Sequence, residues 1–217
     1  MMATSQLSAA SRTAESDHRV ANSLAMVAAL VRIQAKVAGH GGAIPAARVQ
    51  SMFEETAGRI EAIARLHRLL SGEADSALLD VDRFLGEICD LARQTFDPDG
   101  CMALHRSLGV GLKAPAGDLS AIGLIVNEAI VNAYKYSHPT GVSGQVRVAC
   151  QAVGASGLLI VVEDDGVGLP EHFDPRVDGG VGIRIMVGLA EQIGARLSFS
   201  SNTLGLSVQL LVGALAA

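Results

Sequence analysis

The sequence predicts an α+β protein in which a long helical hairpin precedes an α/β sandwich of helices packed on a mostly antiparallel sheet. Residues 14–71 contain two long stretches with apolar residues at helical spacing, separated by a glycine-rich break. After Leu78 the pattern changes to short strand-like segments mixed with helical ones. Apolar residues make up 49% of the 217-residue chain, which is enough for a sizeable core.

The first helix is expected over residues 14–38, which contain no glycine or proline before Gly39. At 100° per residue its apolar positions form one stripe, made of Val20, Leu24, Val27, Val31 and Ala38. His18 and Asn22 fall on roughly the opposite face, so His18 points away from this stripe. Residues 1–12 are small and polar, and we expect them to be disordered.

The glycine-rich segment 39–45 breaks the first helix, and a second helix is expected over residues 46–71. Two long helices joined by a short loop form an antiparallel hairpin. One hairpin cannot bury apolar surface on two sides, whereas two copies can pair into a four-helix bundle. Residues 13–72 are therefore predicted to be a dimerisation hairpin, and the chain to be a homodimer.

Residues 78–217 are predicted to form the second domain. Helices are expected over 81–96, from an N-cap at Asp118 through Ser137, and over 181–193. Strands are expected over 102–108, 110–113, 145–152, 158–163, 196–201 and 205–212. Together these helices and strands predict the α/β sandwich.

Composition excludes several classes of partner. The net charge of −5 gives no electrostatic basis for binding nucleic acid. No apolar run reaches the roughly 18 residues of a membrane span, and the N-terminus lacks the apolar centre of a signal peptide. The three cysteines show neither disulfide nor metal-ligand spacing. We expect a cytoplasmic protein with no nucleic-acid or membrane partner.

The helix that contains Val126–Ser137 carries polar side chains with a possible common task. Glu128 and Asn132 are four residues apart, and Lys135 lies three residues beyond Asn132 on the same side. A carboxylate, an amide oxygen and an ammonium on one face could bind hydrated magnesium and the phosphates it neutralises. A solvated polar face of an amphipathic helix is the alternative interpretation.

Two glycine motifs follow this helix. Asp164 ends a predicted strand, where its carboxylate could accept a hydrogen bond from an exocyclic amine such as that of adenine. Gly166 and Gly168 would let the backbone approach a flat ring, although an ordinary Asp-Gly turn has the same pattern. Further along, the segment 179–182 places Gly180 and Gly182 at the start of a helix, whose N-terminus favours phosphate.

The order of these motifs resembles the GHKL ATP-binding fold (Bergerat fold) of gyrase, Hsp90, histidine kinases and MutL. N-E-A-I-V-N-A-Y-K-Y is similar to its N box, D-D-G-V-G-L-P to its first glycine box and G-G-V-G-I to its second. The N-terminal half resembles sensor histidine kinases of the HWE and HisKA-2 type. There, D-H-R-V-A-N-S-L-A-M-V is similar to the phosphoacceptor box, commonly H-R-V-K-N-N-L-Q, and R-I-E-A-I-A-R-L-H-R-L-L also resembles that family.

For the first helix, the resemblance implies that His18 is the phosphoacceptor. Asn22, one turn further on, would orient phosphate or a hydrolytic water. Arg19 follows His18 where the commonest kinase class has an acidic residue, as in the HWE-like class. Ser23 and Ala25 replace the usual Asn and Gln of the histidine box.

For the second domain, the resemblance implies binding of ATP and magnesium. Glu128 would act as a base or position a metal-bound water, Asn132 would ligate magnesium, and Asp164 would bind the adenine amine. Contacts to phosphate or the nucleotide would come from Lys135 and Tyr136. The pocket and its lid, residues 171–179, would be shaped by Gly166, Gly168, Gly180 and Gly182.

The function implied is a two-component histidine kinase core that passes the phosphoryl group from His18 to an aspartate of a response-regulator receiver domain. The two domains take up about 200 residues, so the input signal would come from a separate sensor or activator protein, or from a domain outside this sequence. The alternative is a histidine phosphotransferase that relays phosphate between receivers without using ATP. A serine kinase acting on an anti-sigma-factor antagonist would not need the helical hairpin, and a non-enzymatic scaffold is a further alternative for the helical bundle.

Overall fold

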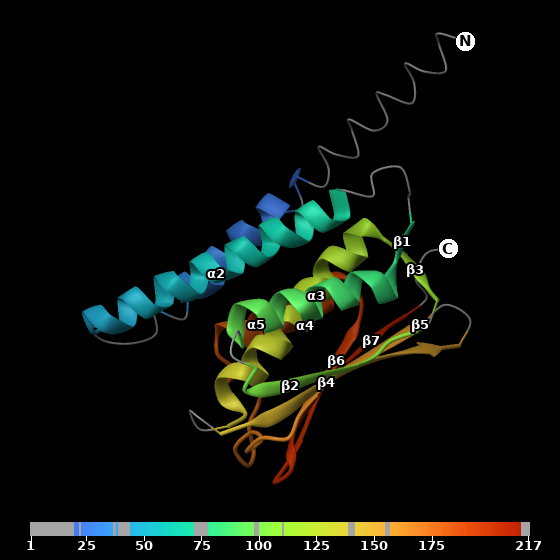
Figure 1. The fold of residues 1–217 in the computed structure, drawn as a ribbon. Coiled ribbons are helices and arrows are strands. Elements are labelled where there is room, and N and C mark those ends of the chain that lie inside the picture. The colour runs from blue at the N-terminus through green and yellow to red at the C-terminus, as the bar shows by residue number, and fades with distance from the viewer. Residues whose placement is uncertain are drawn as a thin grey trace. The chain divides into compact units, whose positions relative to one another are not determined.

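The structure is a computed structural model of the chain. It describes residues 20–21, 23–36, 38, 44–71, 78–97, 100–109, 111–138, 142–154 and 157–213. The chain divides into two compact units, Met1–Ala77 and Leu78–Ala217 (Figure 1). Three sequence-based expectations, for residues 1–12, His18 and Asn22, lie outside the described residues.

The described part of the first unit is helical. Residues 20–21, 23–36 and 38 belong to a first helix, and α2 spans Ala46–Ser71, as the periodicity predicted. A hydrogen bond of 3.1 Å joins Ser23 Oγ to His67 Nδ1, and the Gln34 side chain donates to the Met52 carbonyl oxygen at 3.4 Å. These two pairings run in opposite directions along the chain, so the two helices are antiparallel. The buried apolar side chains of the described part of this unit are Met26, Leu30, Ala62, Ile63, Leu66 and Leu70.

The second unit is built on a five-stranded sheet with the order β2-β4-β5-β7-β6. Its strands are β2 (Met102–Ser107), β4 (Gly144–Val153), β5 (Gly157–Asp164), β6 (Arg196–Asn202) and β7 (Gly205–Val212). Only β2 and β4 pair in parallel within this sheet, and the other neighbours are antiparallel. The mostly antiparallel sheet predicted from the sequence is therefore confirmed.

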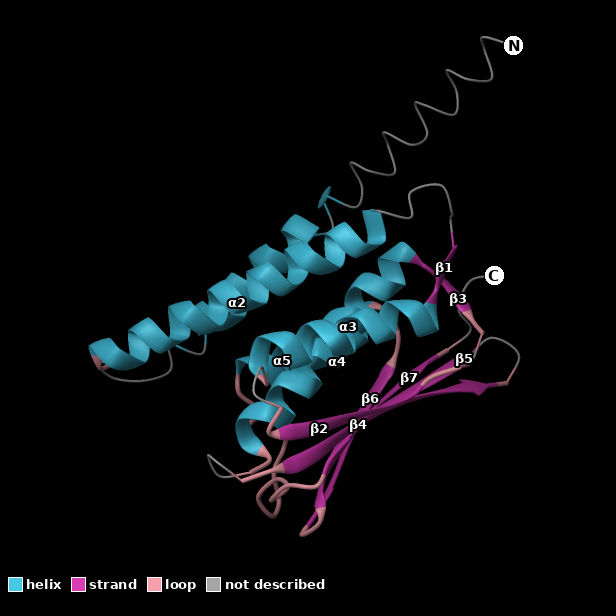
Figure 2. Ribbon diagram, viewed as in Figure 1, coloured by secondary structure: helices cyan, strands magenta, loops and turns pink. Residues whose placement is uncertain are grey.

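Three helices cover one face of this sheet (Figure 2). They are α3 (Val81–Phe96), α4 (Ala116–Tyr136) and α5 (Val181–Gln192), and α4 packs against both of the others. In the strands, alternate residues such as Val146, Val148 and Val162 are buried beneath the helices. Within the described residues, no helix is both long and apolar enough to cross a membrane.

Two details differ from the sequence-based expectations. The strand expected over 110–113 is displaced, because β3 spans Lys113–Pro115 and pairs with β1 (Leu78–Asp80), which the sequence did not predict. Asp118 is not the N-cap of α4: the helix already begins at Ala116, after Pro115. Proline fixes φ near the helical value and fits a helix start, which leaves Asp118 in the first turn, where its charge favours the helix dipole.

Candidate nucleotide-binding site

The C-terminal half of α4 carries four of the predicted site residues. Glu128 is only 1% exposed, whereas Asn132, one turn later, is half-buried. The Lys135 side chain is exposed, and its ammonium lies 5.9 Å from the centre of the Phe96 ring. Tyr136 is 64% exposed. The exposure of these four side chains therefore increases toward the C-terminal end of α4, as a site at that end requires.

Asp164 ends β5, and its carboxylate is fixed by the loop that follows. Asp164 Oδ1 accepts a hydrogen bond of 2.9 Å from the backbone N–H of Gly166. Burial raises the pKa of the Asp164 carboxyl above its ordinary value, and backbone hydrogen bonds from Gly166 and Leu206 offset part of this rise. A half-buried carboxylate held in this way is a hydrogen-bond acceptor prepared for a donor such as an amine.

The first glycine motif packs directly on the end of α4. A Cβ on Gly166 would overlap the backbone of Ser137, so only glycine allows this approach. The neighbouring Val167 N–H donates to the Ser137 carbonyl oxygen at 2.9 Å. The structure thus brings together the ends of two predicted motifs, the polar helix and the Asp164 loop, that are far apart in the sequence.

Gly168 makes the second close approach in this loop. Its φ of 69° is in the left-handed region that favours glycine. A Cβ there would overlap Ser201 Oγ and lie 2.6 Å from the Asn202 carbonyl oxygen. Ser201 Oγ also accepts a hydrogen bond of 2.6 Å from the backbone N–H of Leu169, so the loop is held against the end of β6.

The second glycine motif starts α5. Gly180 is the N-cap and supplies no side-chain cap, while Gly182 is buried within the first turn. The N–H groups of a helix's first turn have no partners within the helix, and their dipole favours an anion. This end of α5 can therefore receive phosphate oxygens.

The predicted lid, residues 171–179, is a series of turns tied to α5. Arg184 donates from Nε to the Gly179 carbonyl oxygen at 2.8 Å and from Nη2 to that of Val177 at 2.9 Å. Arg176 forms an exposed ion pair of 2.8 Å with Glu191. The segment that was predicted to close over the nucleotide thus has defined contacts in the structure.

Several residues that shape this region were not predicted from the sequence. They are Ser137, His138, Gly144, Asp165, Arg184 and Gly205. Two of them had a visible signal: Asp165 doubles the aspartate of the first glycine motif, and His138 follows the polar helix at once. The glycines had no such signal, because what they contact is set by the fold.

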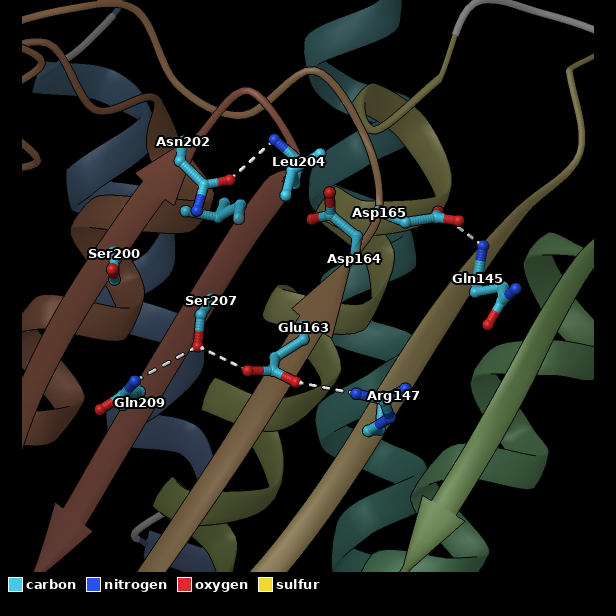
Figure 3. Close-up of a pocket in the computed structure, with 12 residues that line it drawn as sticks. Gln145, Arg147, Glu163, Asp164, Asp165, Ser200, Asn202, Leu204, Ser207 and Gln209 are labelled. Atoms are coloured by element: carbon cyan, nitrogen blue, oxygen red, sulfur yellow. Dashed lines mark hydrogen bonds and ion pairs between the residues drawn. The ribbon is translucent and has the colours of Figure 1, made fainter.

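Asp164 also lines an open hollow of about 410 Å³ at the same end of the sheet, on the face that the helices leave free (Figure 3). The lining side chains bond to one another across three strands: Arg147 to Glu163 at 3.5 Å, Ser207 to Glu163 at 3.3 Å and Gln209 to Ser207 at 3.3 Å. Asp164 is the one predicted site residue in this lining. The hollow therefore differs from the region where the polar helix meets the glycine motifs.

The residues present fit an adenine nucleotide. The Ser137 hydroxyl is buried beside Gly166 and has no hydrogen-bond partner among the described residues, which marks a place for a further polar group. Asp164 offers an acceptor and α5 an uncapped N-terminus. The described residues contain no cluster of three or more His, Cys, Asp and Glu side chains suited to a metal, so magnesium would depend on Asn132, phosphates and water.

Comparison with known proteins identifies both parts of the chain. A family model described as "Histidine kinase" matches residues 15–96, and one described as "Histidine kinase-, DNA gyrase B-, and HSP90-like ATPase" matches residues 117–213. Blue-light-activated histidine kinase 2 of Erythrobacter litoralis is 29% identical over 201 residues, which are 91% of this chain and 55% of that protein. Sensor histidine kinase PdtaS of Mycobacterium tuberculosis is 27% identical over 173 residues, which are 79% of this chain and 33% of that protein.

A solved structure gives the same result. The blue-light-activated histidine kinase of Erythrobacter litoralis superposes with a TM-score of 0.70 at 29% identity, covering 92% of this chain and 57% of that one. The chain thus spans about half the length of this relative and a third of the mycobacterial one. It belongs to the histidine kinases, with an N-terminal region of the HisKA-2 (HWE) type and a C-terminal ATPase domain of the GHKL fold.

Proposed function

We propose that this chain is the kinase core of a two-component system that phosphorylates His18 from ATP. The observation that carries the proposal is the junction of Gly166 and Val167 with Ser137, which joins the polar end of α4 to the Asp164 loop. A nucleotide held there can be bound by both motifs at once. Family membership supports ATP as the nucleotide, because the model that matches residues 117–213 is that of ATPases.

The roles of the side chains follow from their chemistry. Bound ATP would supply the γ-phosphoryl group together with its magnesium ion. Asp164 would accept a hydrogen bond from the adenine amine, Asn132 would ligate magnesium through its amide oxygen, and Lys135 would contact phosphate. Tyr136 and the four motif glycines, Gly166, Gly168, Gly180 and Gly182, shape the pocket. Phosphoryl transfer depends mostly on positioning and charge neutralisation, which these groups supply.

At the other end of the reaction, a ring nitrogen of His18 attacks the γ-phosphorus and ADP leaves. Glu128 would position a water on the magnesium ion or act as a base, and Asn22 would orient the phosphate. The phosphoryl group then passes to an aspartate of a response-regulator receiver domain. We propose further that the chain acts in the cytoplasm as a homodimer and receives its signal from a sensor domain or protein. The ATP-independent relay gains no support from the comparisons.

The test is incubation of the purified chain with magnesium and γ-labelled ATP, beside His18→Ala, Asp164→Ala and His105→Ala. His105 is exposed on β2 and serves as the histidine control. Acid-labile, alkali-stable label is expected on the wild type and on His105→Ala. His18→Ala should bind ATP yet take no label, and Asp164→Ala should bind ATP more weakly and take less label at a given ATP concentration. Label that persists on His18→Ala would exclude His18 as the acceptor.

A further inference from the structure

One contact at the end of α4 belongs to none of the motifs assigned above. His138 Nε2 lies 2.8 Å from Asp165 Oδ1, although 27 residues separate the two in the sequence. His138 stands two residues after the end of α4, and Asp165 directly follows Asp164. The contact therefore connects the helix that carries Asn132 with the strand end that carries the adenine-binding carboxylate.

The acceptor atom of this contact is itself fixed by β4. Asp165 Oδ1 also accepts a hydrogen bond of 2.7 Å from the backbone N–H of Gln145. The Asp165 N–H in turn donates to the Gln145 carbonyl oxygen at 3.3 Å. These hydrogen bonds, first that of Gln145 and then that of His138, lower the pKa of the Asp165 carboxyl. One carboxylate oxygen thus joins the end of α4, the start of β4 and the end of β5.

The imidazole ring of His138 occupies space that Gly144 leaves open. A Cβ on Gly144 would overlap His138 Cδ2 and Nε2 and lie 3.0 Å from Asp165 Oδ1. The Gly144 backbone has no positive φ, so what glycine provides here is space for the ring. The His138 side chain is 17% exposed and that of Asp165 is 47% exposed. The ring is therefore largely enclosed, whereas both side chains of an ordinary surface ion pair are open to water.

We propose that His138 is a positioning residue for nucleotide binding, which holds Asn132 and Asp164 in the geometry that lets both act on one nucleotide. This role rests on the proposed function. Apart from this contact, the polar helix and the Asp164 loop are joined by the Val167–Ser137 hydrogen bond and the close approach of Gly166. A neutral imidazole with its proton on Nε2 donates as an imidazolium does, so the link holds in either protonation state.

The test compares variants that keep the hydrogen bond with variants that remove it. Glutamine places its amide nitrogen near the position of imidazole Nε2, whereas asparagine is too short, so His138→Gln is the conservative variant and His138→Asn the disruptive one. Asp165→Asn keeps Oδ1 as an acceptor, and Asp165→Ala removes it. ATP affinity is measured by calorimetry on the whole chain with magnesium, and KM and kcat of autophosphorylation by label transfer.

His138→Asn and Asp165→Ala are expected to raise the Kd and KM for ATP roughly tenfold while kcat at saturating ATP is retained. His138→Gln and Asp165→Asn should stay within about threefold of the wild type. Because both side chains act through one contact, the double variant His138→Asn with Asp165→Ala should bind no more weakly than the worse single variant. His105→Ala, at an exposed position, should match the wild type.

A merely structural role predicts something else: a lower Tm for the disruptive variants with an unchanged Kd well below that temperature. That result would overturn the positioning role. If His138→Asn does not fold, the Asp165→Ala and Asp165→Asn pair gives the same comparison. A wild-type chain that binds no ATP would overturn the proposed function and this role together. A wild type that binds ATP no more tightly than His138→Asn would overturn this role alone.

Discussion

Gly205 lies against the backbone of Asp164, so closely that a Cβ on Gly205 would overlap the Asp164 carbonyl oxygen. The φ of Gly205 is 131°, which side chains rarely tolerate. Gly205 starts β7 after the turn from β6, and its approach sets that turn against the end of β5. Asp164 is thus placed by a residue that lies far from it in the sequence.

Gly205→Ala should therefore destabilise the chain and weaken ATP binding. The methyl group meets backbone, which cannot move aside cheaply, and the φ angle adds strain, so the loss should be at least about 2–3 kcal/mol. Urea unfolding measures the loss, and calorimetry measures the affinity.

Gly188→Ala is the matched control, because nothing lies within 4 Å of a Cβ at Gly188 on α5. It should stabilise the chain by about 0.5–1 kcal/mol through helix propensity. Equal changes in stability and in ATP affinity for the two substitutions would show that the close approach of Gly205 to Asp164 is important for neither.

How far the sequence predicts this site depends on the range of the interactions. Periodicity and motifs are local, and they correctly located α2, α3 and α5 and the paired strands β4 and β5. The residues that hold Asp164 in place act across the fold: Asp165 meets His138 over 27 residues, and Gly144 fits the His138 ring. No spacing rule connects such partners. The error at Asp118 was local, because Pro115 started the helix one turn earlier than the capping rule suggested.

Asp164 should make ATP binding depend on pH. Burial raises the pKa of its carboxyl, so on acidification Asp164 is protonated at a higher pH than an ordinary aspartate is. Protonation removes the charge-assisted part of the hydrogen bond to the adenine amine. ATP affinity of the wild type should therefore fall as the pH is lowered from 7.5 toward acid (calorimetry at a series of pH values).

Asp164→Asn keeps a neutral acceptor but has no proton to gain, so the difference in affinity between it and the wild type should shrink at low pH. ATP phosphates titrate equally in both proteins and cancel in this difference. At neutral pH Asp164→Ala should cost about 1.5–3 kcal/mol of binding free energy. A pH-independent difference would contradict the assignment of Asp164 to the adenine amine.

Arg184 should hold the lid segment against α5. Its guanidinium donates to two carbonyl oxygens, those of Val177 and Gly179. Lysine keeps the charge but cannot make both bonds from one planar group. Hydrogen exchange of the Val177 and Asp178 amides, which both donate to the Asp174 carbonyl oxygen, should be at least about fivefold faster in Arg184→Lys.

The control for this prediction lies in the same segment. Arg176 pairs with Glu191 at an exposed position, where ion pairs contribute little. Arg176→Lys should therefore leave the exchange of both amides near the wild-type rate. Faster exchange in Arg176→Lys than in Arg184→Lys would show that Arg176, and not Arg184, holds the lid segment.

The homodimer stays a prediction, and the exposed apolar residues of the first unit provide its test. Phe53 is 72% exposed and Ile60, seven residues later, lies on the same face of α2. The first helix exposes Leu24 and Val31 with the same spacing. A heptad spacing of apolar side chains is typical of a helical bundle interface.

Phe53→Glu combined with Ile60→Glu should convert a dimer into monomers in light scattering without lowering the Tm of the second unit. The control adds a charge at another exposed position of α2. Gln50→Glu, one turn before Glu54, should leave the dimer intact. A wild type that is monomeric at micromolar concentration would contradict the bundle prediction.

The cysteines should differ sharply in reactivity. Burial raises the pKa of both the Cys89 and the Cys150 thiol to about 12, whereas Cys101 is exposed. Since the thiolate is the reactive form, a thiol reagent at pH 8 should label Cys101 rapidly and the other two only after unfolding. A raised folded-state pKa also means that these thiols favour the folded state below the unfolded-state value of about 9, and that this contribution is lost as the pH rises toward 12. Urea unfolding between pH 8 and 10.5 should therefore show decreasing stability, and Cys89→Ala should reduce the slope. Rapid labelling of three thiols in the folded chain would contradict the buried positions of Cys89 and Cys150.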